Sequence, residues 1–204
     1  MRAADGPTPR MSAVARLRPD SVPDVETAVL DRARRGDPEA FAVVVRHYDP
    51  ALRALAYRLL GSRDRMDDAL QEAYVKAFRA LPRFRGQSQL GTWLHRIVFN
   101  ACLDELNRLR RAGTVPLDDA AEAVAPLPDH ADVVARRERL EHALATLTPH
   151  DRAAVVLVDG QGFDYAAAAE VLGIPAGTVA SRLNRARAAL RRALEEPLKG
   201  AAES

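Results

Sequence analysis

The stretch that decides the fold is GFDYAAAAEVLGIPAGTVASRLNRARAALRRAL, residues 162–194. Its pattern predicts two helices joined by a tight turn. Asp164 is a good N-cap residue for a first helix over Tyr165–Leu172. Gly173 favours the left-handed backbone conformation that ends a helix, and Pro175 presets the φ angle for the first turn of the next one.

The second of these helices combines a narrow apolar stripe with a basic, polar remainder. At about 100° per residue, the stripe contains Val179, Leu183, Ala186 and Leu190. The residues that fall away from it are Thr178, Ser181, Asn184 and Arg185, with Arg182 at its edge. Residues 175–194 contain no acidic residue, but they include Arg182, Arg185, Arg187, Arg191 and Arg192. A short helix, a turn with glycine and a basic helix form the helix-turn-helix pattern, whose second helix enters the DNA major groove.

An amphipathic helix whose arginines merely face solvent is the alternative interpretation. Solvated helix faces usually mix both signs of charge. Here the acidic residues return only at Glu195 and Glu196. The pattern therefore favours DNA binding.

Composition limits the other functions open to the chain. Its 204 residues are 48% hydrophobic and 5% aromatic with a net charge of +2, so affinity for nucleic acid has to come from local basic patches. The single cysteine, Cys102, excludes a disulfide framework, and the five histidines lack metal-ligand spacing. We expect no metal and no cofactor. There is no apolar run of membrane-spanning length and no signal sequence, so we expect a cytoplasmic protein without membrane insertion.

The N-terminal part predicts a tail followed by helices. Residues 1–23 contain four prolines and no apolar period, which indicates a disordered tail. Residues 24–111 then predict a helical domain. Asp37 and Pro38 form a strong helix start, and Pro50 is expected to kink or break that helix after Tyr48.

The next helix, over residues 62–84, carries an acidic-polar cluster: Asp67, Asp68, Gln71 and Glu72. Favourable charge near a helix N-terminus, worth about 0.5 kcal/mol per residue, explains such a cluster without any partner. A polar loop with Gly86 follows, and then a helix from about Thr92 to Arg111 that leaves Arg96 and Asn100 facing outward.

Residues 112–135 change character. They contain three prolines and five acidic residues, which predicts a flexible acidic linker. Residues 136–196 predict the second helical domain, in which Thr148 and Pro149 start a helix ahead of the helix-turn-helix, and residues 197–204 predict a disordered tail. The predicted fold is all-α: two small helical domains joined by an acidic linker.

Two separate regions resemble one family in the right order. DDALQEAYVKAFRALPRFRGQSQLGTWLHRIVFNACLDELNRLRR, residues 67–111, resembles the second conserved region of the extracytoplasmic-function class of bacterial sigma factors. LTPHDRAAVVLVDGQGFDYAAAAEVLGIPAGTVASRLNRARAALRRAL, residues 147–194, is similar to the fourth. The chain departs from the family at Ala180, where lysine is common, and at Ala167 and Ala168, where bulkier residues are common.

The resemblance implies three sites and two partners, core RNA polymerase and promoter DNA. The acidic-polar cluster of Asp67, Asp68, Gln71 and Glu72 would grip the polymerase. The −10 element, as melted single strand, would be held by Phe84, Arg85, Gly86, Gln87, Ser88, Arg96 and Asn100. The −35 duplex would be read by Thr178, Ser181, Arg182, Asn184, Arg185, Arg191 and Arg192. An anti-sigma partner is left open, and the free protein is expected to be a monomer.

Two other function classes compete with an initiation factor. A stand-alone helix-turn-helix regulator would bind symmetric half-sites without polymerase, but the long linker argues against a rigid dimer. An enzyme is the weakest alternative, because the histidines are scattered and Cys102 suits a core position better than a nucleophilic one.

Overall fold

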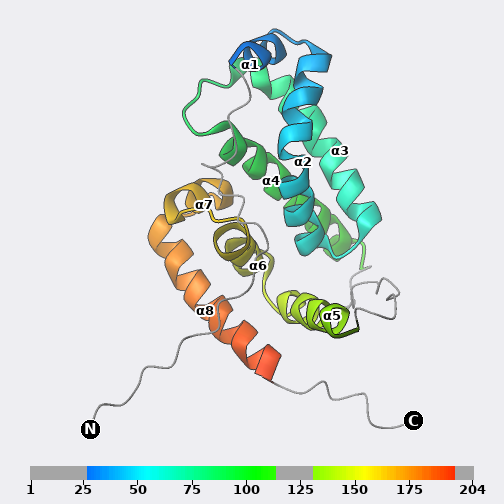
Figure 1. The fold of residues 1–204 in the computed structure, drawn as a ribbon, viewed down its shortest axis with the longest axis vertical. Coiled ribbons are helices and arrows are strands. Elements are labelled where there is room, and N and C mark those ends of the chain that lie inside the picture. Colours follow the sequence, from blue (N-terminus) through cyan, green and yellow to red (C-terminus); the bar gives the residue numbers. More distant parts are fainter. Residues whose placement is uncertain (1–26, 114–130, 196–204) are drawn as a thin grey trace.

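A computed structural model describes residues 27–113 and 131–195, and within these ranges the chain is all-α, as predicted (Figure 1). The first range holds α1 (Thr27–Arg34), α2 (Pro38–Leu60), α3 (Arg63–Ala80), the short 3₁₀ helix η2 (Leu81–Arg83) and α4 (Leu90–Arg111). The second holds α5 (Ala131–Ala145), α6 (Pro149–Val155), the π-helical turn η4 (Val156–Gly160), α7 (Tyr165–Leu172) and α8 (Ala176–Glu195).

The predicted tails, residues 1–23 and 197–204, and most of the predicted linker lie outside the described residues. The linker boundary at residue 135 is wrong, because α5 already begins at Ala131. The acids that suggested a linker extend to Asp132, and acidic residues in a first helical turn are also what a helix N-terminus favours.

Helix starts and ends follow the local chemistry that the sequence indicates. The Asp164 carboxylate accepts a hydrogen bond from the Ala167 backbone N–H at 2.7 Å, and Gly173 ends α7 with a φ of 66°. The Thr148 hydroxyl caps α6 in the same way through the backbone N–H of Asp151. These contacts fix where the helix-turn-helix begins and turns.

Pro50 does not break its helix. α2 runs without interruption from Pro38 to Leu60, and Pro50 lies in its interior. Burial outweighs the cost of the missing N–H, because Val44, Leu52 and Leu55 on either side are fully buried.

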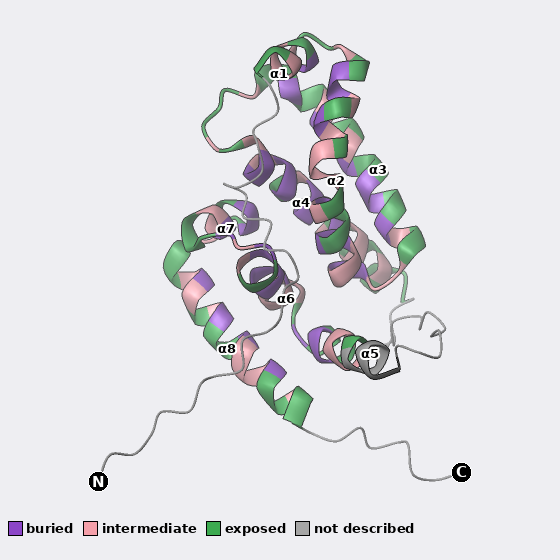
Figure 2. Cartoon of the chain, viewed as in Figure 1, coloured by how far each residue is buried: buried purple, intermediate pink, exposed green. Residues whose placement is uncertain are grey.

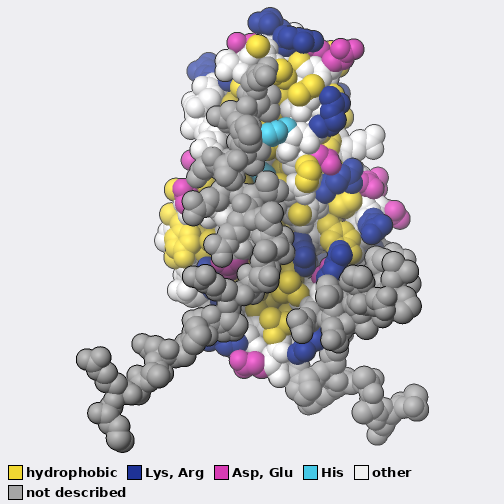
Figure 3. Space-filling model, in the orientation of Figure 1, with side chains coloured by type: hydrophobic (Ala, Val, Ile, Leu, Met, Phe, Trp, Pro, Cys, Tyr) yellow, Lys and Arg dark blue, Asp and Glu magenta, His cyan; other side chains and the backbone are white. Residues whose placement is uncertain are grey.

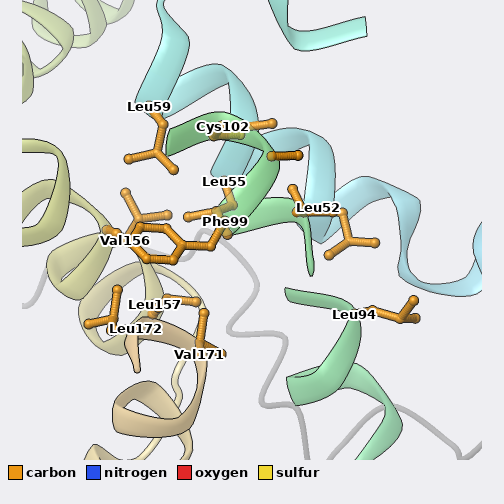
Figure 4. Close-up of a cluster of buried hydrophobic side chains, with 14 of the residues drawn as sticks. Leu52, Leu55, Leu59, Leu94, Phe99, Cys102, Val156, Leu157, Val171 and Leu172 are labelled. Atoms are coloured by element: carbon orange, nitrogen blue, oxygen red, sulfur yellow. The ribbon is translucent and has the colours of Figure 1, made fainter. Parts of the chain in front are cut away.

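The two helical regions pack against each other, an arrangement that the sequence left open. Figure 4 shows Phe99 of α4 and Leu55 of α2 facing Val156 and Leu157 of η4 and Leu172 of α7. All of these side chains are buried in one continuous apolar cluster. Figure 2 shows buried positions along α2, α4, α6 and α7, and also along α3 and α8, which pack on the same cluster. Burial of apolar surface stabilises this contact, by about 25 cal/mol for each Å² removed from water.

Hydrogen bonds tie the two regions together at two further points. The Arg152 guanidinium donates to the carbonyl oxygens of Arg58 and Leu59 at the end of α2, both at 3.2 Å. The Gln161 side-chain amide donates to the carbonyl oxygen of Ala51 at 2.8 Å. Arg152 also donates to the carbonyls of Ala145 and Leu147, so one side chain joins α2, α5 and α6. None of the described helices is long and apolar enough to cross a membrane.

Candidate nucleic-acid and protein interfaces

The face of α8 that points away from α6 and α7 is polar and basic. Its core stripe is the predicted one, since Val179, Leu183, Ala186 and Leu190 are all buried. The predicted DNA contacts that lie fully exposed are Ser181, Asn184, Arg185, Arg191 and Arg192, whereas Thr178 and Arg182 are half-buried. The Ser181 hydroxyl donates to the Thr178 carbonyl at 2.9 Å, so its side chain lies along the helix.

Two arginines of α8 hold the helix in place. Arg182 donates to the Asp151 carboxylate at 3.0 Å, and its side chain is only 25% exposed. Arg187 makes a bidentate pair with Asp159 at 2.6 and 3.0 Å, which raises the pKa of Arg187. The sequence suggested that Arg182 is free to contact a base, but its side chain is engaged with Asp151. Its position at the edge of the apolar stripe is the sequence feature that could have indicated this partial burial.

The acidic-polar cluster of Asp67, Asp68, Gln71 and Glu72, called the α3 cluster from here on, lies exposed on one side of α3. Its members differ in their contacts. Asp67 pairs with Arg53 of α2 at 2.5 Å. Glu72 pairs with Lys76 at 2.9 Å, which lowers the pKa of Glu72, and lies 3.7 Å from Arg108 of α4. Among the described residues, Asp68 and Gln71 make no hydrogen bond or ion pair with their side chains. Half of the cluster thus serves the fold and half is open to a partner.

An apolar groove runs beside the α3 cluster, between α2 and α3. It is lined by Phe41, Tyr74, Val75 and Phe78, with Asp67 and Gln71 at its rim. Val75 is 45% exposed, which is unusual for a large aliphatic side chain. The Tyr74 hydroxyl donates to Asp49 at 2.7 Å, and burial together with this carboxylate raises the pKa of Tyr74. Arg53 and Arg79 also line the groove, so its edge carries both signs of charge, and its apolar floor suits the apolar face of a partner helix.

The loop between η2 and α4 presents polar groups at its tip and an aromatic side chain at its base. Arg85, Gly86 and Gln87 are exposed, Ser88 is half-buried, and Gly86 has a φ of 70° that favours glycine. Phe84 is half-buried and packs on Trp93 with ring centroids 5.0 Å apart. The guanidinium carbon of Arg34 lies over the Phe84 ring, 5.5 Å from its centroid.

Arg96 and Asn100 lie on the exposed face of α4, one helical turn apart. The opposite face of α4 carries two groups that sequence reasoning did not single out, His95 and Phe99. His95 is fully buried, its Nδ1 lies 2.7 Å from the Gly91 carbonyl, and its ring packs edge-on against Phe163 of the C-terminal region. Burial lowers the pKa of His95 to about 4, so the ring is neutral at pH 7. Their spacing of four residues on an apolar face was a signal for burial, although not for which region they contact.

Lys and Arg side chains gather at the α1 end of the molecule (Figure 3). Arg32, Arg34 and Arg35 belong to α1 and the turn after it.

Within the described residues, no three His, Cys, Asp or Glu side chains form a group that could hold a metal ion.

A two-region helical chain that ends in a helix-turn-helix, with an exposed acidic cluster on its first region, defines the class of bacterial sigma factors. Two family models agree. Sigma-70 region 2 matches residues 44–112, and Sigma-70, region 4 matches residues 137–190. The chain belongs to the extracytoplasmic-function class of RNA polymerase sigma factors. Of the two alternatives that the sequence left open, an initiation factor and a stand-alone helix-turn-helix regulator, the family match supports the initiation factor.

Relatives of the class cover most of the chain. The ECF RNA polymerase sigma factor SigM of Mycobacterium tuberculosis strain H37Rv is 42% identical over 159 residues, covering 78% of this chain and 79% of that protein. The RNA polymerase sigma-H factor of Pseudomonas aeruginosa is 35% identical, covering 85% and 95%. The ECF RNA polymerase sigma-E factor of Escherichia coli K12 is 32% identical, covering 81% and 92%.

Two solved structures resemble the described fold. CnrH in complex with the cytosolic domain of CnrY matches with a TM-score of 0.63 and 29% identity, covering 84% of this chain and 97% of that one. The sigma factor RpoE of Bartonella quintana, in complex with the anti-sigma factor NepR, matches with a TM-score of 0.63 and 28% identity, covering 76% and 96%.

Proposed function

We propose that this sigma factor divides its work among three exposed surfaces: the α3 cluster for core RNA polymerase, the loop and α4 face for melted −10 DNA, and α8 for the −35 duplex. The observation that carries the proposal is the pair Asp68 and Gln71. Both are exposed, Gln71 also lines the apolar groove, and among the described residues neither side chain contributes a hydrogen bond to the fold. Side chains that the fold does not use are those that a partner can bind without disturbing the fold.

The −10 surface combines cations and amides from α4 and from the loop before it. Arg96 and Asn100 lie on the same exposed face of α4, and Arg85 and Gln87 extend from the loop. A melted strand offers base edges for an amide and phosphates for a guanidinium. These contacts have to offset the few kcal/mol that unstacking a base costs.

The −35 surface lies on α8. Arg185 and Asn184 are exposed in the first half of the helix, where helix-turn-helix proteins contact bases. Arg191 and Arg192 are exposed two turns further on and suit phosphate contacts. Thr178 and Ser181 also belong to this proposed −35 surface. The hydrogen bond of the Ser181 hydroxyl to the Thr178 carbonyl holds that side chain along the helix backbone, where it supports the exposed face.

A location and a further partner follow from this proposal. The protein is expected to act in the cytoplasm, where core polymerase and promoter DNA are found. The CnrH and RpoE structures contain a bound partner, CnrY in one and the anti-sigma factor NepR in the other. An inhibitory protein of that kind is therefore a further proposed partner of this chain.

Reconstitution with core polymerase tests the proposal. The full chain is added to core enzyme, and transcription is measured from promoters selected from genomic fragments. We expect promoter-specific initiation by the wild type. The double variant Asp68→Asn, Gln71→Ala should fail to bind core polymerase although its Tm is unchanged. Arg63→Ala, Arg65→Ala serves as the matched control, because these residues precede the α3 cluster on the same helix. If the double variant binds core polymerase as tightly as the wild type, the α3 cluster is not the polymerase site.

A further inference from the structure

Phe84 contacts both a cation and a second aromatic ring. The Arg34 guanidinium carbon is 5.5 Å from the centroid of the Phe84 ring, and the Trp93 ring centroid is 5.0 Å away from it. Arg34 belongs to α1, Phe84 follows η2, and Trp93 lies in the first turn of α4. Three elements thus meet at the base of the loop.

The Arg34 guanidinium makes few polar contacts with the rest of the described residues. Its Nε is buried and has no hydrogen-bond partner among the described residues, and its only ion pair, with Asp31, is long at 3.8 Å. A guanidinium with so little electrostatic compensation gains most from lying over an aromatic face. The packing on Phe84 is therefore the main contact of the Arg34 head group.

The corner between α1 and α2 sets the direction of Arg34. Asp37 caps α2 through the backbone N–H groups of Glu39 and Ala40, and the same carboxylate pairs with Arg32 at 2.6 Å. Ala33, beside Arg34, is fully buried. One carboxylate thereby joins the end of α1 to the start of α2, and α1 contacts η2 directly.

We infer that Arg34 is a positioning residue for the −10 loop: by stacking on Phe84 it holds the base of the loop against Trp93, so that the exposed tip, Arg85 to Gln87, is presented in one arrangement. This inference rests on the proposed −10 role of the loop. It also reassigns Phe84, which is half-buried and already contacts Arg34 and Trp93, from a base contact to an anchor.

The chain carries its own probe of this stack, because Trp93 is its only tryptophan. In the free protein, Arg34→Ala should raise the acrylamide quenching of Trp93 fluorescence by about twofold. Arg34→Lys should lie between Arg34→Ala and the wild type, because lysine keeps the charge but not the planar stacking group. Arg35→Ala is the matched control: it removes an exposed arginine from the adjacent position, and its quenching should equal that of the wild type. Unchanged quenching in Arg34→Ala would overturn the inference.

The second measurement separates positioning from charge. Holoenzyme formed with each variant is titrated with a fluorescent single-stranded −10 oligonucleotide at several salt concentrations. Arg34→Ala should weaken binding by about two- to fivefold with the same salt slope as the wild type, whereas loss of a phosphate contact lowers the slope by about one. A lowered slope, or an equal loss in Arg35→Ala, would show that Arg34 acts by charge and would overturn the inference. If Arg96→Ala and Asn100→Ala leave oligonucleotide binding unchanged, the −10 proposal itself fails, whatever the quenching of Trp93 shows.

Discussion

Arg182 of α8 and Asp151 of α6 form an ion pair of 3.0 Å whose side chains are only 25% and 16% exposed. Asp151 also accepts a hydrogen bond from the Thr148 hydroxyl that caps α6. The pair thus connects α8, the proposed −35 helix, to the N-terminus of the helix packed beneath it. Arg182 orients α8 and Arg185 remains the exposed arginine next to it.

We expect Arg182→Met to lower the free energy of unfolding by about 1–2 kcal/mol, because it leaves the Asp151 carboxylate without its cation in a half-buried position. Chemical denaturation monitored by circular dichroism measures the change. Arg185→Met, at an exposed position without such a pair, is the control and should change stability by less than about 0.5 kcal/mol. Equal stability of the two variants would show that the ion pair does not hold α8.

The exposed arginines of α8 should separate into two kinds. Arg185→Ala is expected to cost about 1–3 kcal/mol of binding free energy on the preferred promoter and to relax preference at one base pair. Arg191→Ala should weaken binding to all sequences alike and lower the salt slope by about one. Holoenzyme binding to a set of −35 variants, at two salt concentrations, distinguishes them. A uniform loss in Arg185→Ala would move base reading to Asn184 or Ser181.

Gln71→Ala combined with Glu72→Lys should weaken binding to core polymerase, because it removes one side chain that the fold does not use and reverses the charge of its neighbour. Stability should fall by less than about 1 kcal/mol, since the Glu72 pairs with Lys76 and Arg108 are exposed to solvent. Polymerase affinity and Tm are measured on the same preparation. A large fall in Tm would mean that the cluster serves folding, as favourable charge at a helix N-terminus does.

His95 predicts how stability depends on pH. Its pKa is about 4 in the folded protein, because burial penalises the charged ring, and near 6.5 once unfolded. The unfolded chain therefore binds more protons between these values, so the free energy of unfolding should fall as the pH drops from 6.5 to 4, by at most about 3 kcal/mol. Urea unfolding at pH 7.5, 5.5 and 4.5 measures it. His95→Gln should remove most of the slope. The rest is expected from His150, whose pKa burial also lowers.

Local chemistry made much of this fold predictable. Asp164, Gly173 and Thr148 act through the backbone atoms next to them, so the helix-turn-helix could be placed to the residue. The apolar stripe of α8 was predictable for the same reason, because helical periodicity is set within a few residues.

Contacts between distant residues could not be read in this way. Arg152 and Leu59 are 93 positions apart, and an arginine that binds carbonyls looks in sequence like one that faces solvent. The same holds for the candidate sites: the sequence placed Arg182 near the DNA face, but only the fold shows that Asp151 pairs with it. Pro50 illustrates the converse, since tertiary burial overrides a local rule.

The packing of the two regions bears on how the protein engages a promoter. The names of the −10 and −35 elements give their positions along the promoter, so the two lie about 25 base pairs apart. At 3.4 Å per base pair this is about 85 Å along the DNA. A compact chain of this length has a radius of gyration of about 17 Å, so it is about 40–45 Å across. The packed form described here is therefore too small to reach both elements. The proposed function requires the contact of α4 with α7 and the hydrogen bonds of Arg152 and Gln161 to open.

Opening has a free-energy cost that polymerase binding has to supply, and this predicts an effect of the interface on affinity. Gln161→Ala removes the hydrogen bond to Ala51 that joins the regions, worth about 1 kcal/mol. We expect it to lower Tm by a few degrees and yet to raise the affinity for core polymerase by about fivefold, because less of the binding free energy is used for opening. The free wild type should bind duplex promoter weakly and in a salt-sensitive way, measured by anisotropy at physiological salt, and Gln161→Ala should not change this. Asp164→Ala is the control, since the Asp164 side chain caps α7 and, unlike Gln161, makes no described hydrogen bond to the first region: it should lower Tm and leave polymerase affinity unchanged. If Gln161→Ala lowered the affinity for polymerase, or if the free wild type bound duplex promoter with nanomolar, sequence-specific affinity, the packed form would be the active one.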